Sequence, residues 1–147
     1  MRYSELKGRK LVDTTSAETV GKVDGFLIDP ETRAVVALEF KKTEHGSVVA
    51  WADLTAVGAD AVTIAGTDAL VDPDGRLAEL ATKDGAVLKK RVLSAAGEDL
   101  GQVRDLELDA ETGAVRELLV GEKKHLLPVA GDRLLGIGSY AVVVKAD

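Results

Sequence analysis

The sequence contains no cysteine, which excludes disulfides, thiolate metal sites and cysteine nucleophiles and is compatible with a reducing cytoplasm, where we expect the protein to reside. Aromatic residues make up only 3% of the chain, so aliphatic residues must fill the core, and the β-branched ones favour strands. The uncharged runs are far shorter than the roughly 18 residues of a membrane-spanning helix. Residues 1–7 also lack the apolar stretch of a signal peptide. We therefore expect a soluble protein without a membrane anchor.

The strongest pattern that is present is an internal repeat at an offset of 80 residues. Identical pairs in this register are Lys10 and Lys90, Val12 and Val92, Gly21 and Gly101, Val23 and Val103, Asp29 and Asp109, Thr32 and Thr112, and Leu38 and Leu118. We expect a two-residue insertion to follow in the second copy, which aligns Trp51 with Val129 before the register returns at Leu54 and Leu134. The order and spacing of these matches predict a tandem duplication.

Each copy has the pattern of short strands separated by polar turns. In the first copy the predicted strands are 10–13, 20–28, 34–40, 47–51 and 61–64. Asp29 and Pro30 begin a hairpin turn. This turn ends at Arg33 in the first copy and at Gly113 in the second, where a turn with a bulge favours a left-handed residue. Because a unit of about 65 residues with open edges would be marginally stable, we expect each copy to close into a small antiparallel barrel.

Residues 72–81 have a different, helical pattern. Alanine, leucine and glutamate favour helices, and Leu77, Leu80 and Ala81 would share one face. Asp72 or Asp74 can cap the start. We expect a helix of two or three turns whose apolar side packs on one or both barrels, because so short a helix is unstable alone.

The predicted organisation is therefore mainly β, with two tandem barrels joined by a short α-helical linker. The three parts are a first barrel at 1–66, the linker at 67–85 and a second barrel at 86–147. Their net charges are −2, −3 and −1, so the linker supplies half of the net charge of −6. An acidic chain with nearly neutral barrels argues against a dedicated nucleic-acid binder.

Eight segments of the two copies follow a known pattern. They are ETVGKV (18–23), IDPET (28–32), VVAW (48–51) and VGADAV (57–62) in the first copy, and DLGQV (99–103), LDAETG (108–113), LLPV (126–129) and GIG (136–138) in the second. Together these segments resemble the PRC-barrel family, which includes the cytoplasmic part of the photosynthetic reaction-centre H subunit and the C-terminal domain of a ribosome maturation factor. The resemblance implies a roughly six-stranded barrel that docks onto other macromolecules, without shared catalytic, cofactor or metal-binding residues.

Basic residues recur in both copies and are candidates for an interaction surface that attracts an acidic protein or RNA. They are Arg9, Lys10, Lys41, Lys42, Lys89, Lys90, Arg91, Lys123 and Lys124. An ordinary mixed surface is the alternative, and the scarcity of aromatic side chains that could stack on bases weakens the RNA interpretation. Trp51, the single tryptophan, either anchors an interface or lies in the core or at a barrel end.

The remaining candidates favour structural roles. His45 and His125 match at the same offset, each in the turn before the third long strand, and form either a metal or pH-sensing pair or two exposed turn residues. The acidic residues near the hairpins lack the spacing of a calcium loop and fit turn chemistry. No Gly-x-Ser-x-Gly motif occurs, and the glycines at 136–138 lack the lysine of a phosphate loop.

Three functions remain open. The first is a non-enzymatic, cytoplasmic interaction or scaffolding module that docks onto a protein or onto a second copy of itself. The alternative is a ribosome- or RNA-associated maturation factor, supported by the repeated basic residues. A small-ligand binder or enzyme has the least support, and it would require a deep pocket with convergent polar groups between the barrels.

Overall fold

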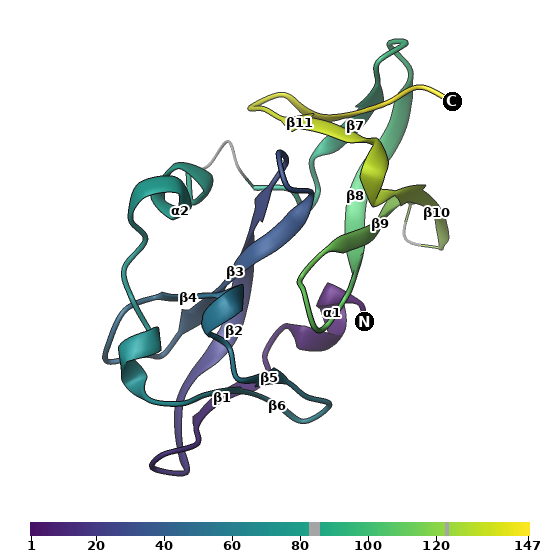
Figure 1. Cartoon of the computed structure of the whole chain (residues 1–147). Helices are drawn as coiled ribbons and strands as arrows, with labels where there is room; N and C mark the ends of the chain where they lie inside the picture. The colour runs from purple at the N-terminus through teal and green to yellow at the C-terminus, as the bar shows by residue number, and fades with distance from the viewer. Residues whose placement is uncertain (83–85, 123) are drawn as a thin grey trace.

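The computed structural model describes residues 1–82, 86–122 and 124–147, and it is mainly β (Figure 1). The first half contains α1 (Tyr3–Leu6), β1 (Lys10–Asp13), β2 (Glu18–Asp29), β3 (Ala34–Lys41), β4 (Val48–Ala50), the 3₁₀ helix η1 (Trp51–Asp53), β5 (Ala56–Val57) and β6 (Ala61–Ile64). The 3₁₀ helix η2 (Thr67–Ala69) and α2 (Gly75–Leu80) follow. The second half contains β7 (Arg91–Ser94), β8 (Asp99–Leu108), β9 (Val115–Glu122), β10 (His125–Ala130), η4 (Gly131–Arg133), β11 (Leu134–Ile137) and β12 (Ala141–Val144).

The two halves have the same topology. Each forms a six-stranded sheet, in the orders β4-β3-β2-β1-β6-β5 and β10-β9-β8-β7-β12-β11. This confirms the predicted duplication of a mainly β unit. The sheets are not purely antiparallel, because β1 pairs with β6, and β7 with β12, in parallel. Among the described residues, no helix has the length and apolar character needed to cross a membrane.

The first strand of each half follows a register that differs from the predicted one. Leu11 pairs with Gly21 and Val62, whereas Val92 pairs with Gly101 and Val142, so Leu11 and Val92 are equivalent at an offset of 81. The predicted matches of Lys10 with Lys90 and of Val12 with Val92 are therefore wrong by one residue. A slip of one residue moves a strand's side chains to the opposite face, and both Leu11 and Val92 are fully buried.

The predicted insertion in the second half is also wrong. Leu38 pairs with Val49, and Leu118 pairs with Val129, so the offset stays at 80 through the third strands. Trp51 begins η1 rather than ending a strand, and its counterpart is Gly131, which begins η4.

The two sheets meet where their long hairpins end. Ala34 faces Ala114 in an antiparallel bridge. The Val35 N–H donates to the Gly113 carbonyl at 2.8 Å, and the Val115 N–H donates to the Arg33 carbonyl at 3.0 Å. Val35 corresponds to Val115, and Arg33 to Gly113, at the offset of 80, so the two hydrogen bonds are equivalent. A pseudo-twofold axis therefore passes between the two alanines. One buried apolar cluster extends through both halves.

Trp51 and Gly113 fit together at this joint. Trp51 is 7% exposed and donates from its indole N–H to the Glu111 carbonyl at 3.3 Å. A Cβ on Gly113 would lie 2.9 Å from the Trp51 ring. Arg33 replaces Gly113 in the other hairpin, with the expected left-handed φ of 57°, and donates to the Leu134 carbonyl at 2.8 Å. Trp51 therefore belongs to the core at the joint.

The linker helix packs on the first sheet. This helix, α2, is shorter than predicted, at six residues, and Asp74 caps it by accepting from the Gly75 N–H at 2.8 Å. Leu80 packs with Leu27, Ala37 and Val48, the last of which lies on the sheet's edge strand. The second half has Glu107, Glu117 and Pro128 at the corresponding positions. At these three positions the first sheet is apolar and the second is not, and the helix lies beside β2 and β3 of the first sheet (Figure 1).

The edge strands β4 and β10 are protected in different ways. Val48 on the edge strand β4 exchanges two backbone hydrogen bonds, both of 2.9 Å, with Val71 of the linker. Its counterpart on β10 is Pro128, which has no N–H to offer a further strand. The duplicated edge is thus covered in one half and blocked by proline in the other.

Candidate functional site

Two of the predicted basic residues close equivalent turns. Arg9 donates from its guanidinium to the Gly58 carbonyl at 2.6 Å, and Lys90 donates from Nζ to the Gly138 carbonyl at 2.7 Å. Arg9 and Lys90 are equivalent at the offset of 81. Their contacts fix the loops between the last two strands of each half.

A row of lysines crosses the first sheet. Lys10 faces Lys22 across β1 and β2, and Lys22 faces Lys41 across β2 and β3. Asp24 lies 3.7 Å from the Lys41 ammonium. In the second half, Arg91 faces Gln102 instead and pairs with Asp99 at 2.9 Å. The structure thus brings two of the predicted basic residues together through Lys22, which the sequence analysis did not single out.

Three other predicted basic residues, Lys42, Lys89 and Lys124, are exposed in turns. Lys42 and Lys89 both have left-handed backbones, with φ values of 59° and 69°. Lys124 is exposed beside the start of β10, and Lys123 lies outside the described residues. Whether any of these side chains meets a partner stays a prediction.

The aspartates that begin the two hairpin turns, Asp29 and Asp109, accept hydrogen bonds within those turns, and Asp29 also pairs with an arginine. The Asp29 carboxylate accepts from the Glu31 N–H and from Arg76, and this bond to Arg76 holds the pKa of Asp29 below its ordinary value. The Asp109 carboxylate accepts the equivalent Glu111 N–H at 2.8 Å. These contacts account for the aspartates as turn residues.

The two histidines occupy similar but not identical places. His45 is exposed in the turn before β4, whereas His125 is exposed as the first residue of β10. Within the ranges that the structure describes, no group of three or more histidines and carboxylates could hold a metal ion.

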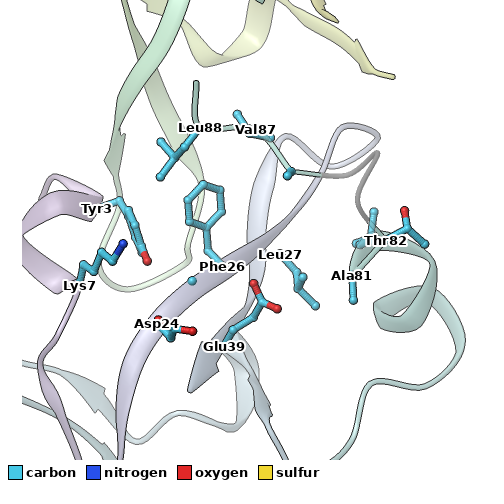
Figure 2. Close-up of a pocket in the computed structure, with 13 residues that line it drawn as sticks. Tyr3, Lys7, Asp24, Phe26, Leu27, Glu39, Ala81, Thr82, Val87 and Leu88 are labelled. Atoms are coloured by element: carbon cyan, nitrogen blue, oxygen red, sulfur yellow. The ribbon is translucent and has the colours of Figure 1, made fainter. Parts of the chain in front are cut away.

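A pocket of about 310 Å³ lies where α1, β2, β3, the end of α2 and residues 86–88 converge (Figure 2). Its apolar lining includes Phe26, Leu27, Leu80, Val87 and Leu88, and its polar lining includes Tyr3, Lys7, Asp24 and Glu39. We call it the Glu39 pocket. Figure 2 shows the oxygens of Tyr3, Asp24 and Glu39 toward one end, with the Phe26 ring, Val87 and Leu88 toward the other. The sequence analysis did not predict this pocket.

The environment of the Glu39 pocket shifts the pKa values of two of its polar groups. Burial raises the pKa of Glu39 above its ordinary value, and the neighbouring Asp24 charge adds to this shift. Burial likewise raises the pKa of the Tyr3 phenol, with the nearby carboxylates, that of Asp24 foremost, contributing. Shifts of this kind are common where a fold places charged groups for binding rather than for stability.

A second candidate surface covers β7, β12 and β11 of the second half. Leu93 pairs with Val143, and Val143 with Gly136, to form an outward-facing row. Leu135 and Tyr140 beside it are 46% and 76% exposed. We call Leu93, Leu135, Tyr140 and Val143 the apolar face. These residues, apart from Leu135, line a shallow hollow around Gly136, together with Ile137, which also packs against the buried cluster.

The equivalent surface of the first half is more polar. The counterparts of Leu135, Tyr140 and Val143 are Thr55, Asp60 and Thr63. The duplication has therefore produced two outer faces with the same backbone and different chemistry.

The profile of the PRC-barrel domain matches residues 1–78 and, a second time, residues 83–147. The protein belongs to the PRC-barrel family. The two matched ranges agree with the two equivalent sheets. Domains of this family are small modules that are typically non-catalytic. Comparison of this PRC-barrel protein with curated proteins finds no match.

A comparison of the two copies could have pointed to some residues of both sites in the sequence. At offset 80, Gly25 corresponds to Asp105, and Glu39 corresponds to Leu119. The carboxylate of this pair therefore lies on β3 in the first half and on β8 in the second. Such paired differences mark places where the two halves diverge, although their burial and neighbours depend on the tertiary structure.

Proposed function

We propose that this PRC-barrel protein is a non-enzymatic docking module that binds a protein through the apolar face of its second half. The observation that carries this proposal is the difference between equivalent surfaces: Leu135, Tyr140 and Val143 replace two threonines and an aspartate. Exposed apolar side chains on one half cost solubility and contribute nothing to the core, so their gathering on one outer face favours a binding role.

The first partner to test is a second copy of the chain. The apolar face adjoins β11, an edge strand of its sheet. An edge strand beside an apolar surface is a template for pairing, and two identical edges can pair about a twofold axis. We expect the protein to act in the cytoplasm, in keeping with its lack of cysteine.

The test uses the chain's own first half as a guide. The triple variant Leu135→Thr, Tyr140→Asp and Val143→Thr gives the apolar face the side chains of its counterpart. Light scattering after gel filtration measures self-association, and crosslinking followed by affinity purification from native lysate measures other partners. We expect the wild type to form complexes that the triple variant, with an unchanged circular dichroism spectrum, does not form. Identical complexes from both proteins would refute the proposal.

RNA binding is a second candidate function, favoured by the lysine row. Like charges directly opposite each other on neighbouring strands are destabilising, so Lys10, Lys22 and Lys41 favour an anionic partner. A gel-shift titration against ribosomal RNA at low salt is the test. We expect a complex that weakens as salt is added, and the absence of a complex even at low salt would eliminate this candidate.

A further inference from the structure

The Glu39 pocket has a chemical character that the docking proposal does not use. Its apolar lining and its carboxylates lie toward different ends, as Figure 2 shows. Small-molecule sites commonly combine apolar walls with a few convergent polar groups. The ligand that fits this arrangement has an apolar part and a polar end.

Two polar groups of the pocket lack partners among the described residues. Tyr3 is only 2% exposed, yet its phenol makes no hydrogen bond within 1–82, 86–122 and 124–147. The half-buried carboxylate of Glu39 makes neither a hydrogen bond nor an ion pair in the same part of the chain. Among the described residues every fully buried side-chain N or O atom has a hydrogen-bond partner, so the oxygens of Tyr3 and Glu39 must reach the open space of the pocket, where a ligand can meet them.

In the second half, the carboxylate at the equivalent position accepts hydrogen bonds. Gly25 faces Glu39 across β2 and β3, while Asp105 faces Leu119 across β8 and β9. Asp105 accepts hydrogen bonds from the Ser4 N–H, at 3.0 Å, and from the Ser4 hydroxyl. The carboxylate at this place in the second half thus receives donors from α1.

In the first half the carboxylate comes from the opposite strand. A Cβ at Gly25 would lie 2.6 Å from Glu39 Oε1, so the glycine leaves the space into which the carboxylate folds. The duplicated position therefore keeps a carboxylate in both halves, and only that of the second half has its donors among the described residues.

We propose that the Glu39 pocket binds a primary ammonium group carried on a short alkyl stem. An ammonium group has three donors and no acceptor, and it faces the carboxylates of Glu39 and Asp24 together with the Tyr3 oxygen. The stem lies against the apolar wall. Asp24 already lies 3.7 Å from the Lys41 ammonium. Lys7 also lines the pocket, but within the described residues it forms no ion pair with Glu39, so Glu39 is the carboxylate that an incoming ammonium group would pair with.

The same chemistry has two sources, a free alkylamine or the lysine side chain of a protein. The probe for the first is n-butylammonium chloride, added to the ¹⁵N-labelled full-length protein and followed by amide chemical shifts. We expect saturable shifts at Gly25, Phe26 and Glu39, with a dissociation constant on the order of millimolar, because so small a ligand has few atoms to offset its loss of freedom. n-Butanol, which has the stem without the charge, should give no saturable shift.

Single substitutions identify the side chains that bind the ammonium group. Glu39→Gln should weaken butylammonium binding on the order of tenfold, since it removes a charge-assisted hydrogen bond. Tyr3→Phe, which keeps the buried ring, should weaken it several-fold and remains informative if the first variant does not fold. Glu117→Gln, on a half-buried strand position outside the pocket, should leave it unchanged. Absence of saturable shifts, or equal binding by wild type and both pocket variants, would overturn the proposal.

A lysine peptide distinguishes the two sources. If acetyl-Ala-Lys-Ala-amide displaces butylammonium, the pocket accepts a protein side chain; if butylammonium binds and the peptide does not, the ligand is a free amine. Either result supports the ammonium site. No residue of the apolar face lines the Glu39 pocket, so the failure of one proposal leaves the other standing.

Discussion

Replacing Gly113 by alanine tests how tightly the two halves of this PRC-barrel protein are joined. Gly113 has a φ of +79° and lies against Val35 and Trp51. A methyl group there would overlap the Val35 carbonyl oxygen and lie 2.9 Å from the Trp51 ring. The substitution therefore perturbs both the backbone of the hairpin and the contact across the pseudo-twofold axis.

The expected loss has two parts that a matched control separates. A non-glycine residue in the left-handed region costs about 1 kcal/mol, and forcing a methyl group into a filled space costs about 1–3 kcal/mol. Gly113→Ala should therefore lower the free energy of unfolding by about 2–4 kcal/mol. Gly97→Ala has a similar φ of +85° and no atom within 4 Å of its new methyl group, so it should show only the backbone part.

The assay is urea unfolding followed by the fluorescence of Trp51, the single tryptophan and a residue that is 7% exposed at the joint. We expect Gly113→Ala to unfold at lower urea than Gly97→Ala. Its folded-state emission should also shift to longer wavelength, because the methyl group displaces the indole. Equal midpoints for the two variants would refute the view that the halves are held by close packing at this glycine.

Three further predictions concern the linker helix and the acidic groups. Leu27→Glu places the charge of the second half's counterpart beneath α2 and should lower the free energy of unfolding in urea by about 3 kcal/mol or more; a loss below about 1 kcal/mol would contradict the packing described. Glu39→Gln should stabilise the protein near neutral pH, because the raised pKa of Glu39 means that its ionised form disfavours folding. This gain should vanish in thermal melts at acidic pH, where the wild-type carboxyl is protonated in both states, and a gain that grew on acidification would be inconsistent with it. Arg76→Gln should destabilise the protein above the unfolded pKa of Asp29 and lose this effect as pH falls through the lowered folded pKa, so a pH-independent difference would argue against the ion pair.

The duplication and its turns could be predicted because they depend on local residue types. Asp29 and Asp109 each accept the N–H two residues later, as their side chains favour in any such turn. The one-residue shift at the first strand could not be predicted. Val12 and Val92 are identical, and the correct partner of Val92, Leu11, is an equally good strand residue.

The amino-acid sequence by itself determined that this PRC-barrel protein is two copies of a β unit, because alternating apolar residues and turn residues act over a few positions. Only the tertiary structure decided that the hairpins meet at Ala34 and Ala114, and that α2 covers the first sheet. It also decided that Tyr3 and Glu39 line one pocket. These arrangements depend on contacts between residues distant in the chain, for which no local period exists.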